Sequence, residues 1–511
     1  MLLAGALAAS ACSSSGGDDD DSAESSGGGD RILRYGYDMS AQFTNTFDIA
    51  TSKGDCDSIV LAPIYDTLVH KKPGNVLEPG LLEKWEVIDA STLDLYLREG
   101  LVFSDGTPLN ADALQQGLEH NADNDQLSDL RKIDSFEKID DTTLRVKMKK
   151  PIAVQMPATF SSRDGMIMKP GSTSDAPIGA GPFVLTKSDP GSVISVRTND
   201  KYWNKDVYEG LDGVDYTQTG TGPPAVTALL AGDLDLVRME AESYADLKDK
   251  DGYEVVVQPT GAYLQFEFRQ SYKDAPTPFA NVQVRQAVSH AIDREKINEV
   301  VQDGLGEVAT QPFPEDSDAY VPEVADLYPY DPDQAKQLLT EAGYPDGFEF
   351  TMAIPGGNIT NMERMSTLVQ EQLGAVGIKA NIKRILGTDI ATQYYILGGG
   401  DAFSAAELDT TFPTGKLQNN YGVGEFVAIW DGAEDQAMTD LMTEAQGTTD
   451  ENESYALVRQ GVTTAMQNAL DVPIAFMPQL MAYNSDRVSG TVGGQTNICD
   501  PPDLTAAVVK G

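Results

Sequence analysis

The chain has 511 residues, 41% of them apolar, which is enough for two or three domains with large cores. Its 79 acidic and 37 basic residues give a formal net charge of −42, so nucleic acid and anionic lipid are poor partners for the surface as a whole. The three histidines and three cysteines lack zinc-site spacing, and no phosphate-binding loop or nucleophile elbow occurs, so we expect no metal, no cofactor and no enzyme activity.

The N-terminus reads as an export and anchoring signal. The apolar run from Leu2 to Ala11 is too short to span a bilayer and has the length of a secretory h-region. The triplet before Cys12 is similar to a bacterial lipobox. We therefore expect a signal-peptide remnant over 1–11 and a disordered tether over 12–30, with Cys12 lipidated at the outer face of the cell membrane. The alternative is a frayed N-terminus with an incidental cysteine.

The first half of the folded chain predicts mostly hairpins. A first strand is expected over 31–39 and an apolar helix over 56–70. Leu93, Leu95 and Leu97 alternate on one face of a hairpin, and Asn110 is the expected cap of the next helix. The predicted hairpins cover, in chain order, 84–100, 136–148 and 181–203.

After about residue 260 strands and helices alternate. The segment 331–344 predicts a helix capped by Asp331 and ended by Gly343. A strand, a helix over 361–376 and a strand over 378–385 follow, which suits parallel pairing. Two helices over 433–447 and 452–470 precede an apolar strand, so the chain predicts two α/β lobes of different connectivity.

Several motifs resemble one known family. The stretch "LREGLVFSDGTPLNADAL" (97–114) resembles the signature of the extracellular solute-binding proteins of family 5, the peptide- and nickel-type receptors of ABC importers. The agreement continues in order through "IYDTLV", "APIGAGPFVL", "NDKYWN", "PFANVQVRQAVSHAIDREKI" and "YDPDQAKQLLTEAGYPDGF". It covers residues 31 to about 490.

The resemblance implies a bilobed α/β fold of the periplasmic-binding-protein type (class II, cluster C), with an extra domain inserted in lobe I. Carried over, lobe I holds 31–63, 166–260 and 480–511, the extra domain holds 64–165, and lobe II holds 261–479. The crossings between the lobes, near 261–268 and 473–483, are the expected hinges. Because this division puts Cys56 and Cys499 in or beside one lobe, it also implies a disulfide between them, with two free buried thiols as the alternative.

The resemblance further implies a binding mechanism, in which two lobes close on a solute and hand it to a permease with transmembrane and ATPase subunits. In peptide-binding members an acid of lobe II pairs with the amino terminus of the ligand, and the matching stretch "FSAAELDTTFP" carries Glu407 and Asp409. "NNYG" resembles another segment beside the cleft and adds Asn420 and Tyr421. Phe43 and Tyr263 are further candidates because of their places after the first strand and at a hinge.

We therefore expect a monomeric receptor for an oligopeptide or dipeptide, anchored to the membrane only through lipid. An oligosaccharide or other small solute is the nearest alternative, since aromatic and acidic side chains also suit sugars. Nickel ranks lower because the histidines are few. A secreted hydrolase or a peptide-signal sensor would be a different class of protein.

Overall fold

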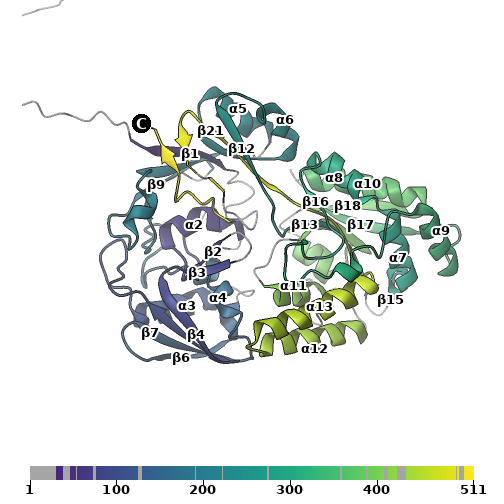
Figure 1. The fold of residues 1–511 in the computed structure, drawn as a ribbon, viewed down its shortest axis with the longest axis horizontal. Coiled ribbons are helices and arrows are strands. Elements are labelled where there is room, and N and C mark those ends of the chain that lie inside the picture. The colour runs from purple at the N-terminus through teal and green to yellow at the C-terminus, as the bar shows by residue number, and fades with distance from the viewer. Residues whose placement is uncertain are drawn as a thin grey trace, which may run out of the picture.

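The computed structural model describes most of the chain after residue 29. The described residues are 30–37, 46–52, 55–72, 76–124, 129–189, 191–220, 222–272, 275–356, 360–386, 390–407, 412–422, 433–490, 492–493 and 500–510. They form two lobes, each built on a mixed sheet, and a smaller antiparallel sheet beside the first lobe (Figure 1). In the described residues no helix is both long and apolar enough to cross a membrane.

Lobe I is built on a seven-stranded sheet. Its central strand β1 (Ile32–Tyr37) runs parallel to both of its neighbours, and Leu33, Tyr35 and Tyr37 alternate into the core that α2 (Ser58–Tyr65) covers. On the other face, α5 (Pro223–Ala231) packs against β11 and β21. In sheet order the strands are β12 (Tyr253–Gln258), β21 (Gln479–Asn484), β11 (Leu236–Met239), β1, β10 (Gly213–Gln218), β9 (Val193–Thr198) and β8 (Phe183–Asp189).

A four-stranded antiparallel sheet forms the centre of the extra domain. Leu93 and Leu95 alternate into its core as predicted, and α3 (Ala111–Asn124) covers it with Leu114 and Leu118. Asn110 caps this helix by accepting a hydrogen bond from the amide of Ala113 (3.1 Å). The strands are β4 (Leu82–Asp89), β5 (Thr92–Leu97), β7 (Thr143–Met148) and β6 (Ile133–Lys138), and nearby lie β2 (Val69–Lys72), β3 (Val76–Pro79) and α4 (Met156–Thr159).

Lobe II is built on a six-stranded sheet. The predicted strand–helix–strand unit is present, and its two strands pair in parallel over eight residues. In sheet order the strands are β16 (Glu307–Val308), β20 (Asp471–Phe476), β13 (Tyr263–Phe268), β19 (Ala402–Glu407), β17 (Glu349–Gly356) and β18 (Lys379–Leu386). The helices are α7 (Val282–Ala291), α8 (Arg294–Gln302), α9 (Pro332–Glu341), α10 (Thr360–Ala375), α11 (Pro413–Tyr421), α12 (Ala433–Gly447) and α13 (Glu451–Gln467).

The remaining described elements are short. They are α6 (Tyr244–Leu247), the pair β14 (Ser271–Tyr272) and β15 (Ala275–Pro276), and the pair β22 (Val488–Ser489) and β23 (Val508–Val509). The last pair packs in the lobe I core through Val488 and Val509. Ion pairs of Lys71 and Lys72 with Asp500 and Asp503 join the C-terminal segment to β2 beside the extra domain.

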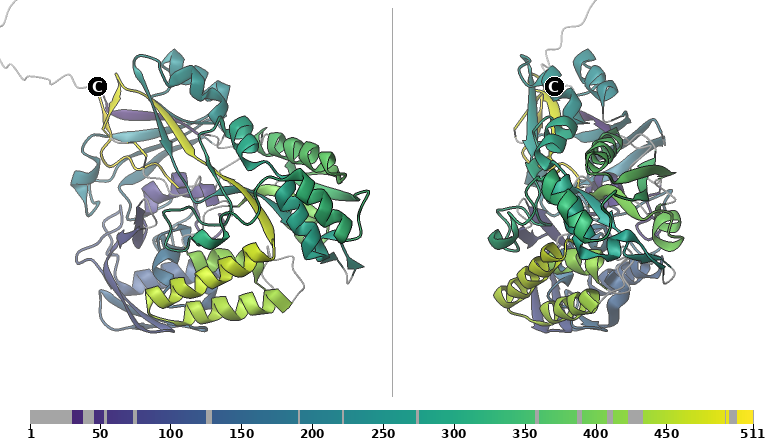
Figure 2. Two further views of the ribbon diagram at one scale, coloured as in Figure 1. Left: turned by 45° about the vertical axis from the view of Figure 1, so that its right-hand side comes forward. Right: turned by 90° about the vertical axis from the view of Figure 1, so that its right-hand side faces the viewer.

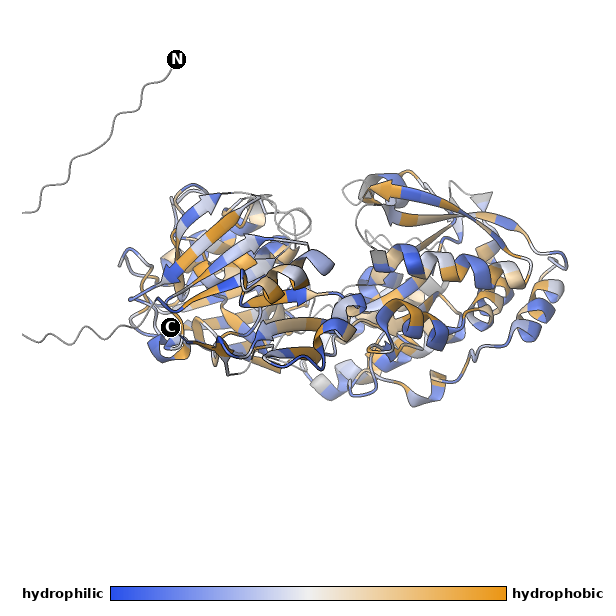
Figure 3. Cartoon of the chain, turned by 90° about the horizontal axis from the view of Figure 1, so that it is seen from above, coloured by the Kyte–Doolittle hydropathy of each residue, from blue (hydrophilic) through white to orange (hydrophobic). Residues whose placement is uncertain are grey.

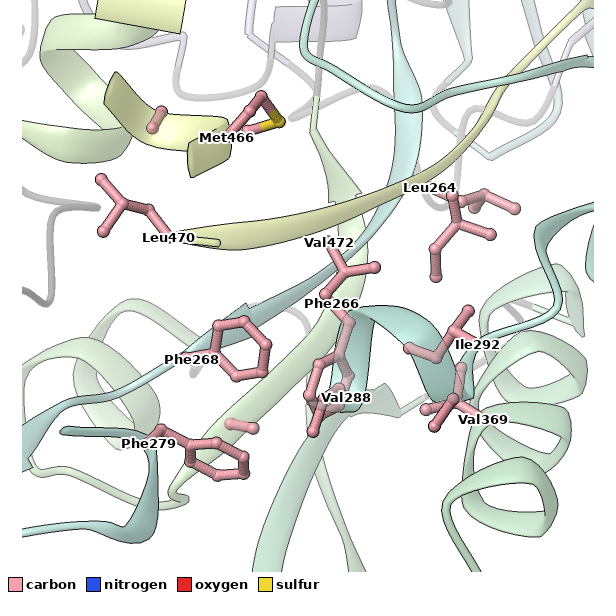
Figure 4. Packing of buried hydrophobic residues seen from close by; sticks show 14 of the residues in the cluster. Leu264, Phe266, Phe268, Phe279, Val288, Ile292, Val369, Met466, Leu470 and Val472 are labelled. Atoms are coloured by element: carbon pink, nitrogen blue, oxygen red, sulfur yellow. The ribbon is translucent and has the colours of Figure 1, made fainter. Parts of the chain in front are cut away.

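The core of lobe II is aromatic and lies on one face of its sheet. Leu264, Phe266 and Phe268 of β13 point to this face, where Val288 and Ile292 meet them (Figure 4). Phe266 contacts Phe268 edge to face, with ring centroids 5.4 Å apart. In Figure 3 the inner strands carry many apolar residues, whereas hydrophilic residues spread over the outer helices and loops.

Two hydrogen-bonded crossings connect the lobes. The chain leaves lobe I after β12 and enters β13, and it returns from β20 to β21 through Met477. Thr260 Oγ1 donates to the carbonyl of Met477 (2.6 Å), and the amide of Met477 donates to the carbonyl of Ala262 (2.8 Å). Figures 1 and 2 show both strand pairs running on from one sheet into the other. This connection is the hinge.

One predicted helix is shorter than expected. The apolar helix predicted over 56–70 ends at Tyr65, because Asp66 adopts a positive φ of 57°. The Asp66 carboxylate accepts hydrogen bonds from the amide of Thr67 (2.8 Å) and the hydroxyl of Tyr202 (3.0 Å), and Nε2 of His70 lies 2.6 Å from it. These tertiary contacts stabilise a turn that local helix propensity disfavours.

Candidate functional site

The second face of the lobe II sheet is polar. In β13 the side chains of Tyr263, Gln265 and Glu267 alternate with the three core residues and point away from them. All three are buried, and Gln265 Nε2 donates to Glu267 Oε1 (2.7 Å). The strand therefore has two buried faces, of which one is apolar and the other carries hydrogen-bonding groups.

Three carboxyl groups lie on this polar face. Glu267 stands opposite Asp471 of β20, and Tyr263 stands opposite Glu407 of β19. Opposed residues of antiparallel strands share a face, with Cβ atoms about 5 Å apart. Burial, together with the charges of Glu407 and Asp471, raises the pKa of Glu267 well above its ordinary value. Burial also raises the pKa of Asp471 to about 7.

Helix α11 covers the polar face with Lys416 and Tyr421. Pro413 occupies the first position of this helix, where its fixed φ is favourable. Lys416 Nζ donates to the carbonyl of Gly261 (2.9 Å) and lies 4.7 Å from the ring centroid of Tyr263. The hydroxyls of Tyr421 and Tyr263 lie near Asp471, and burial raises the pKa of both tyrosines well above the ordinary value.

A π-helical turn over Ala391–Ile396 closes the side of the polar face. Its Tyr395 hydroxyl donates to Glu267 Oε2 (3.4 Å), and its Tyr394 ring stacks on Phe403 with centroids 4.8 Å apart. Arg269 donates to the carbonyls of Tyr394 (2.7 Å) and Gly400 (3.2 Å). The polar face is thus enclosed by aromatic side chains, as in many small-molecule sites.

Lobe I has a buried cation on β11 and a buried amide beside the hinge. Arg238 on β11 is 8% exposed and acts electrostatically on the buried Tyr35 hydroxyl, whose pKa burial raises to about 12. Gln479, the first residue of β21, lies two residues beyond Met477 at the hinge. It is 2% exposed, and within the described residues neither atom of its side-chain amide has a hydrogen-bond partner.

Two hydrogen bonds away from the hinge join the lobes. Gln155 of the extra domain donates through Nε2 to Thr414 Oγ1 on α11 (2.7 Å), and this bond is buried. Asn361 of α10 donates through Nδ2 to Glu240 Oε2, just after β11 (2.9 Å). The lobes are therefore in contact away from the hinge as well as at it, and these bonds stabilise the lobes in their present contact.

We expect Gln155→Ala to shift the receptor toward its open form. Losing one buried hydrogen bond removes about 1 kcal/mol from the closed state, which lowers the closed-to-open ratio about five-fold. Fluorescence energy transfer between dyes on the two lobes of the ligand-free protein measures this ratio. Gln115→Ala, which removes a surface bond to Glu119 in the same domain, is the matched control. Equal transfer efficiency in both variants would contradict the prediction.

The structure brings three of the predicted ligand-binding residues together. Tyr263 and Glu407 are opposite each other, and the Tyr421 hydroxyl lies beside Tyr263, with Asn420 next to it on α11. The other two, Phe43 and Asp409, lie outside the described residues. Tyr421 also packs in the core of lobe II, so it has a structural role as well.

Several members of the polar face were not predicted from the sequence, although they surround the residues that were. They are Gln265, Glu267, Tyr395, Lys416 and Asp471. The alternation of Tyr, Gln and Glu with apolar residues over 263–268 is a strand signal that could have pointed to Gln265 and Glu267.

Cys56 and Cys499 were predicted to form a disulfide, and the cysteines and histidines were considered as metal ligands. Cys56 is disulfide-bonded. The other two cysteines, Cys12 and Cys499, lie outside the described residues, so pairing with Cys499 stays a prediction. Among the residues that the structure describes, no group of three or more His, Cys, Asp or Glu is arranged to hold a metal ion.

Two lobes, a double-stranded hinge and buried polar groups between the lobes define a solute-binding receptor of the periplasmic-binding-protein type. Residues 76–443, more than half of the chain, match the family model for the middle region of bacterial extracellular solute-binding proteins, family 5. The chain belongs to this family, whose members are the substrate-binding proteins of ABC importers and not enzymes. The family predicted from the motifs is thereby confirmed.

Individual relatives differ in what their names say they bind. The chain is 28% identical over 482 residues to heme-binding protein A of Haemophilus influenzae, covering 84% of each chain. It is 28% identical over 359 residues to a glutathione-binding protein of Escherichia coli K12, covering 67% of this chain and 68% of that protein.

Solved structures with the same fold confirm the predicted fold class. A dipeptide-binding protein from Pseudoalteromonas, solved with Met-Leu, matches with a TM-score of 0.78 at 21% identity, over 94% of this chain and 100% of that chain. A Brucella suis protein solved with Fe(III)-EDTA matches with a TM-score of 0.80 at 19% identity, with the same coverage. At these identities the matches support the fold and not a particular ligand.

Proposed function

We propose that this receptor takes a peptide-like solute between its lobes, closes on it at the hinge and delivers it to an ABC permease. The observation that carries the proposal is the group of carboxyl side chains on the polar face of lobe II, Glu267, Glu407 and Asp471, enclosed by aromatic side chains. A free peptide has an ammonium group at one end, so a buried face that carries carboxyl groups is complementary to it.

A ligand screen by thermal shift tests this function. A ligand present at 100 times its dissociation constant adds about 2.7 kcal/mol of stability, so a bound peptide is expected to raise the melting temperature by several degrees. The screen includes di- and tripeptides, oligosaccharides and chelated metals. A shift with a sugar and none with any peptide would end the peptide proposal and favour the oligosaccharide alternative. Conversion of a bound peptide to a new mass would favour the secreted hydrolase instead.

We also propose that lipid on Cys12 anchors the receptor to the outer face of the membrane. The support is the lipobox-like triplet and the polar segment that follows it. Cys12→Ala is expected to move the protein from the membrane fraction to the soluble fraction of the producing cells. Ser13→Ala, one residue further along, is the control and is expected to stay membrane-bound. A membrane-bound Cys12→Ala protein would contradict the anchor.

Two further proposals concern lobe I and the lobe boundaries. We propose that Cys499 is the partner of Cys56, since Cys56 is disulfide-bonded and packs against the lobe I core, which includes Val492 and Leu504 on either side of residue 499. Mass mapping of alkylated, exported protein tests the pairing. We keep the predicted boundaries of the lobes as a proposal, supported by the change of sheet between Gln258 and Tyr263 and again between Phe476 and Gln479.

A further inference from the structure

Four buried oxygen atoms on the polar face of lobe II have no hydrogen-bond partner within the described part of the chain. They are Tyr263 OH, Gln265 Oε1, Tyr421 OH and Asp471 Oδ1, and their residues are at most 3% exposed. The Tyr263, Tyr421 and Asp471 groups lie close enough to interact, but these atoms form no hydrogen bond of good geometry with one another. Leaving a polar atom buried and unpaired costs about 1–3 kcal/mol, so four such atoms on one face favour the binding of a polar group there.

The four atoms share one chemical property, which is that each can accept a hydrogen bond. Asp471 Oδ1, when ionised, and Gln265 Oε1 only accept, and a tyrosine oxygen accepts as well as donates. Gln265 already uses its amide nitrogen to donate to Glu267. A face that offers several acceptors suits a group with several donors. An ammonium group has three N–H donors and a guanidinium group has five.

The charged groups around Asp471 leave its unpartnered oxygen available. Lys416 on α11 donates to the carbonyl of Gly261, and Arg294 on α8 donates to the carbonyl of Pro473. On β13, Glu267 faces Asp471 directly, and the Tyr395 hydroxyl donates to Glu267 from the π-helical turn. The remaining titratable groups on this face are Glu407, Arg269, Tyr263, Tyr394 and Tyr421.

We propose that Tyr263, Gln265, Tyr421 and Asp471 form a subsite for a cationic nitrogen group of the solute, an ammonium or a guanidinium, and that Asp471 sets the preference for positive charge. The subsite rests on the proposed function, because the solute must enter between the lobes. Its acid, Asp471, lies on β20, whereas the segment that the family resemblance implies for a peptide amino terminus begins at Glu407 on β19, opposite Tyr263. We assign the subsite to a second positive group, a lysine- or arginine-like side chain.

Proton linkage distinguishes this subsite from a structural carboxyl. Burial raises the pKa of Asp471 to about 7, and a cation bound beside it favours the ionised form and releases the proton to solvent. Affinity for a cationic solute should therefore fall as the pH drops below about 7, whereas affinity for a neutral analogue of the same shape should not. Between pH 7.5 and 5.5 we expect a loss of about ten-fold or more.

Isothermal titration calorimetry with matched tripeptides tests the proposal. The probes are Ala-Lys-Ala, Lys-Ala-Ala and Ala-Ala-Lys, each compared with the same peptide in which norleucine replaces lysine. We expect one lysine peptide to bind at least ten-fold more tightly than its norleucine partner. Titrations in phosphate and in Tris report the proton released, since the two buffers differ in ionisation enthalpy.

Three variants test whether the preference for lysine peptides comes from this subsite. Asp471→Asn should abolish both the lysine preference and the proton release while norleucine peptides still bind. Tyr421→Phe removes one hydrogen-bond acceptor and keeps the ring, so it should reduce the preference for lysine over norleucine about three- to ten-fold. It tests the subsite if Asp471→Asn does not fold. Glu349→Gln, which removes an exposed carboxylate of lobe II paired with Lys379, is the control and should leave both unchanged.

Three results would overturn the subsite in different ways. Equal binding of lysine and norleucine peptides at every position contradicts the subsite and leaves the peptide receptor intact. Binding of neither kind of peptide contradicts the proposed function and the subsite with it. A lysine preference that persists in Asp471→Asn with unchanged proton release excludes Asp471 as its source.

Discussion

Phe266→Ala is expected to destabilise lobe II by about 3–5 kcal/mol, the largest single effect among these predictions. Phe266 is fully buried in the middle strand of the lobe II core, with edge-to-face contacts to Phe268 and Phe350. Truncation removes the transfer free energy of the ring and leaves a cavity that a sheet covered on both faces cannot collapse. Because Gln265 and Glu267 flank Phe266 on the polar face, the same change should weaken solute binding.

Urea denaturation followed by circular dichroism measures the loss of stability. Phe266→Leu keeps most of the volume and should cost less than about 1.5 kcal/mol. Leu386→Ala truncates a side chain that is 63% exposed at the end of β18, and it should change the free energy of unfolding by less than about 0.5 kcal/mol. A loss in Phe266→Ala no greater than that in Leu386→Ala would show that this core does not carry the stability of lobe II.

Asp235→Asn is expected to cost about 3 kcal/mol in lobe I. The Asp235 carboxylate is fully buried and accepts hydrogen bonds from Arg34 Nε (3.0 Å), Arg34 Nη2 (2.6 Å) and Arg487 Nε (3.1 Å). It thereby joins β1 to the returning C-terminal segment. Both arginines remain about one-third exposed, so water reaches them in the variant and the cost stays near the lower end of the range for broken buried pairs.

The effect of Asp235→Asn should depend on pH. Burial alone would raise the pKa of Asp235, but the hydrogen bonds from Arg34 and Arg487 outweigh burial and hold it below its ordinary value. A carboxyl group whose pKa is lower in the folded than in the unfolded state stabilises the fold. This contribution is complete at pH values above the unfolded-state pKa, and it is lost as the pH falls through the folded-state pKa. The difference between wild type and variant should therefore be constant near pH 7 and shrink below about pH 4.

Asp215→Asn is the matched control, since Asp215 pairs with Arg197 in the same sheet but is 28% exposed. A surface pair of this kind contributes about 0–1 kcal/mol. Thermal unfolding of wild type and the two variants at pH 7 and at about pH 3, below the ordinary pKa of an aspartate, distinguishes the buried pair from the surface pair. Equal losses at pH 7, or a difference for Asp235→Asn that does not shrink in acid, would contradict the role of the buried carboxylate.

Most secondary structure could be predicted because its signals are local. The unit of β17, α10 and β18 follows directly from two-residue and 3.6-residue periodicity with short connections. The helix α9 begins at Pro332, directly after its cap Asp331, as expected, and Gly343 follows its end with a φ of +92°. The end of α2 was not predictable from local signals, because Asp66 is stabilised by Tyr202, which lies more than 100 residues further along the chain.

The site was predictable only in part. Glu407 and Tyr421 were predicted because their segments resemble the family, and Tyr263 because of its place at a hinge. The structure places these three together. No local pattern distinguishes Asp471 from the many other acids of this chain. Asp471 differs from those acids because it is buried beside Glu267 and because one of its carboxylate oxygens has no hydrogen-bond partner within the described residues. Both features depend on the packed structure.

The amino-acid sequence by itself determined the class of this protein: its strands and helices, its two lobes, its family and the absence of the common catalytic motifs. These follow from periodicity, capping residues and motifs that span a few neighbouring residues. Only the tertiary structure decided which buried groups meet. Glu267 and Asp471 are about 200 residues apart in the chain and become opposite partners because β13 and β20 pair at the hinge. Strand register is a long-range property, and it brings an acid, two tyrosines and an amide to one face.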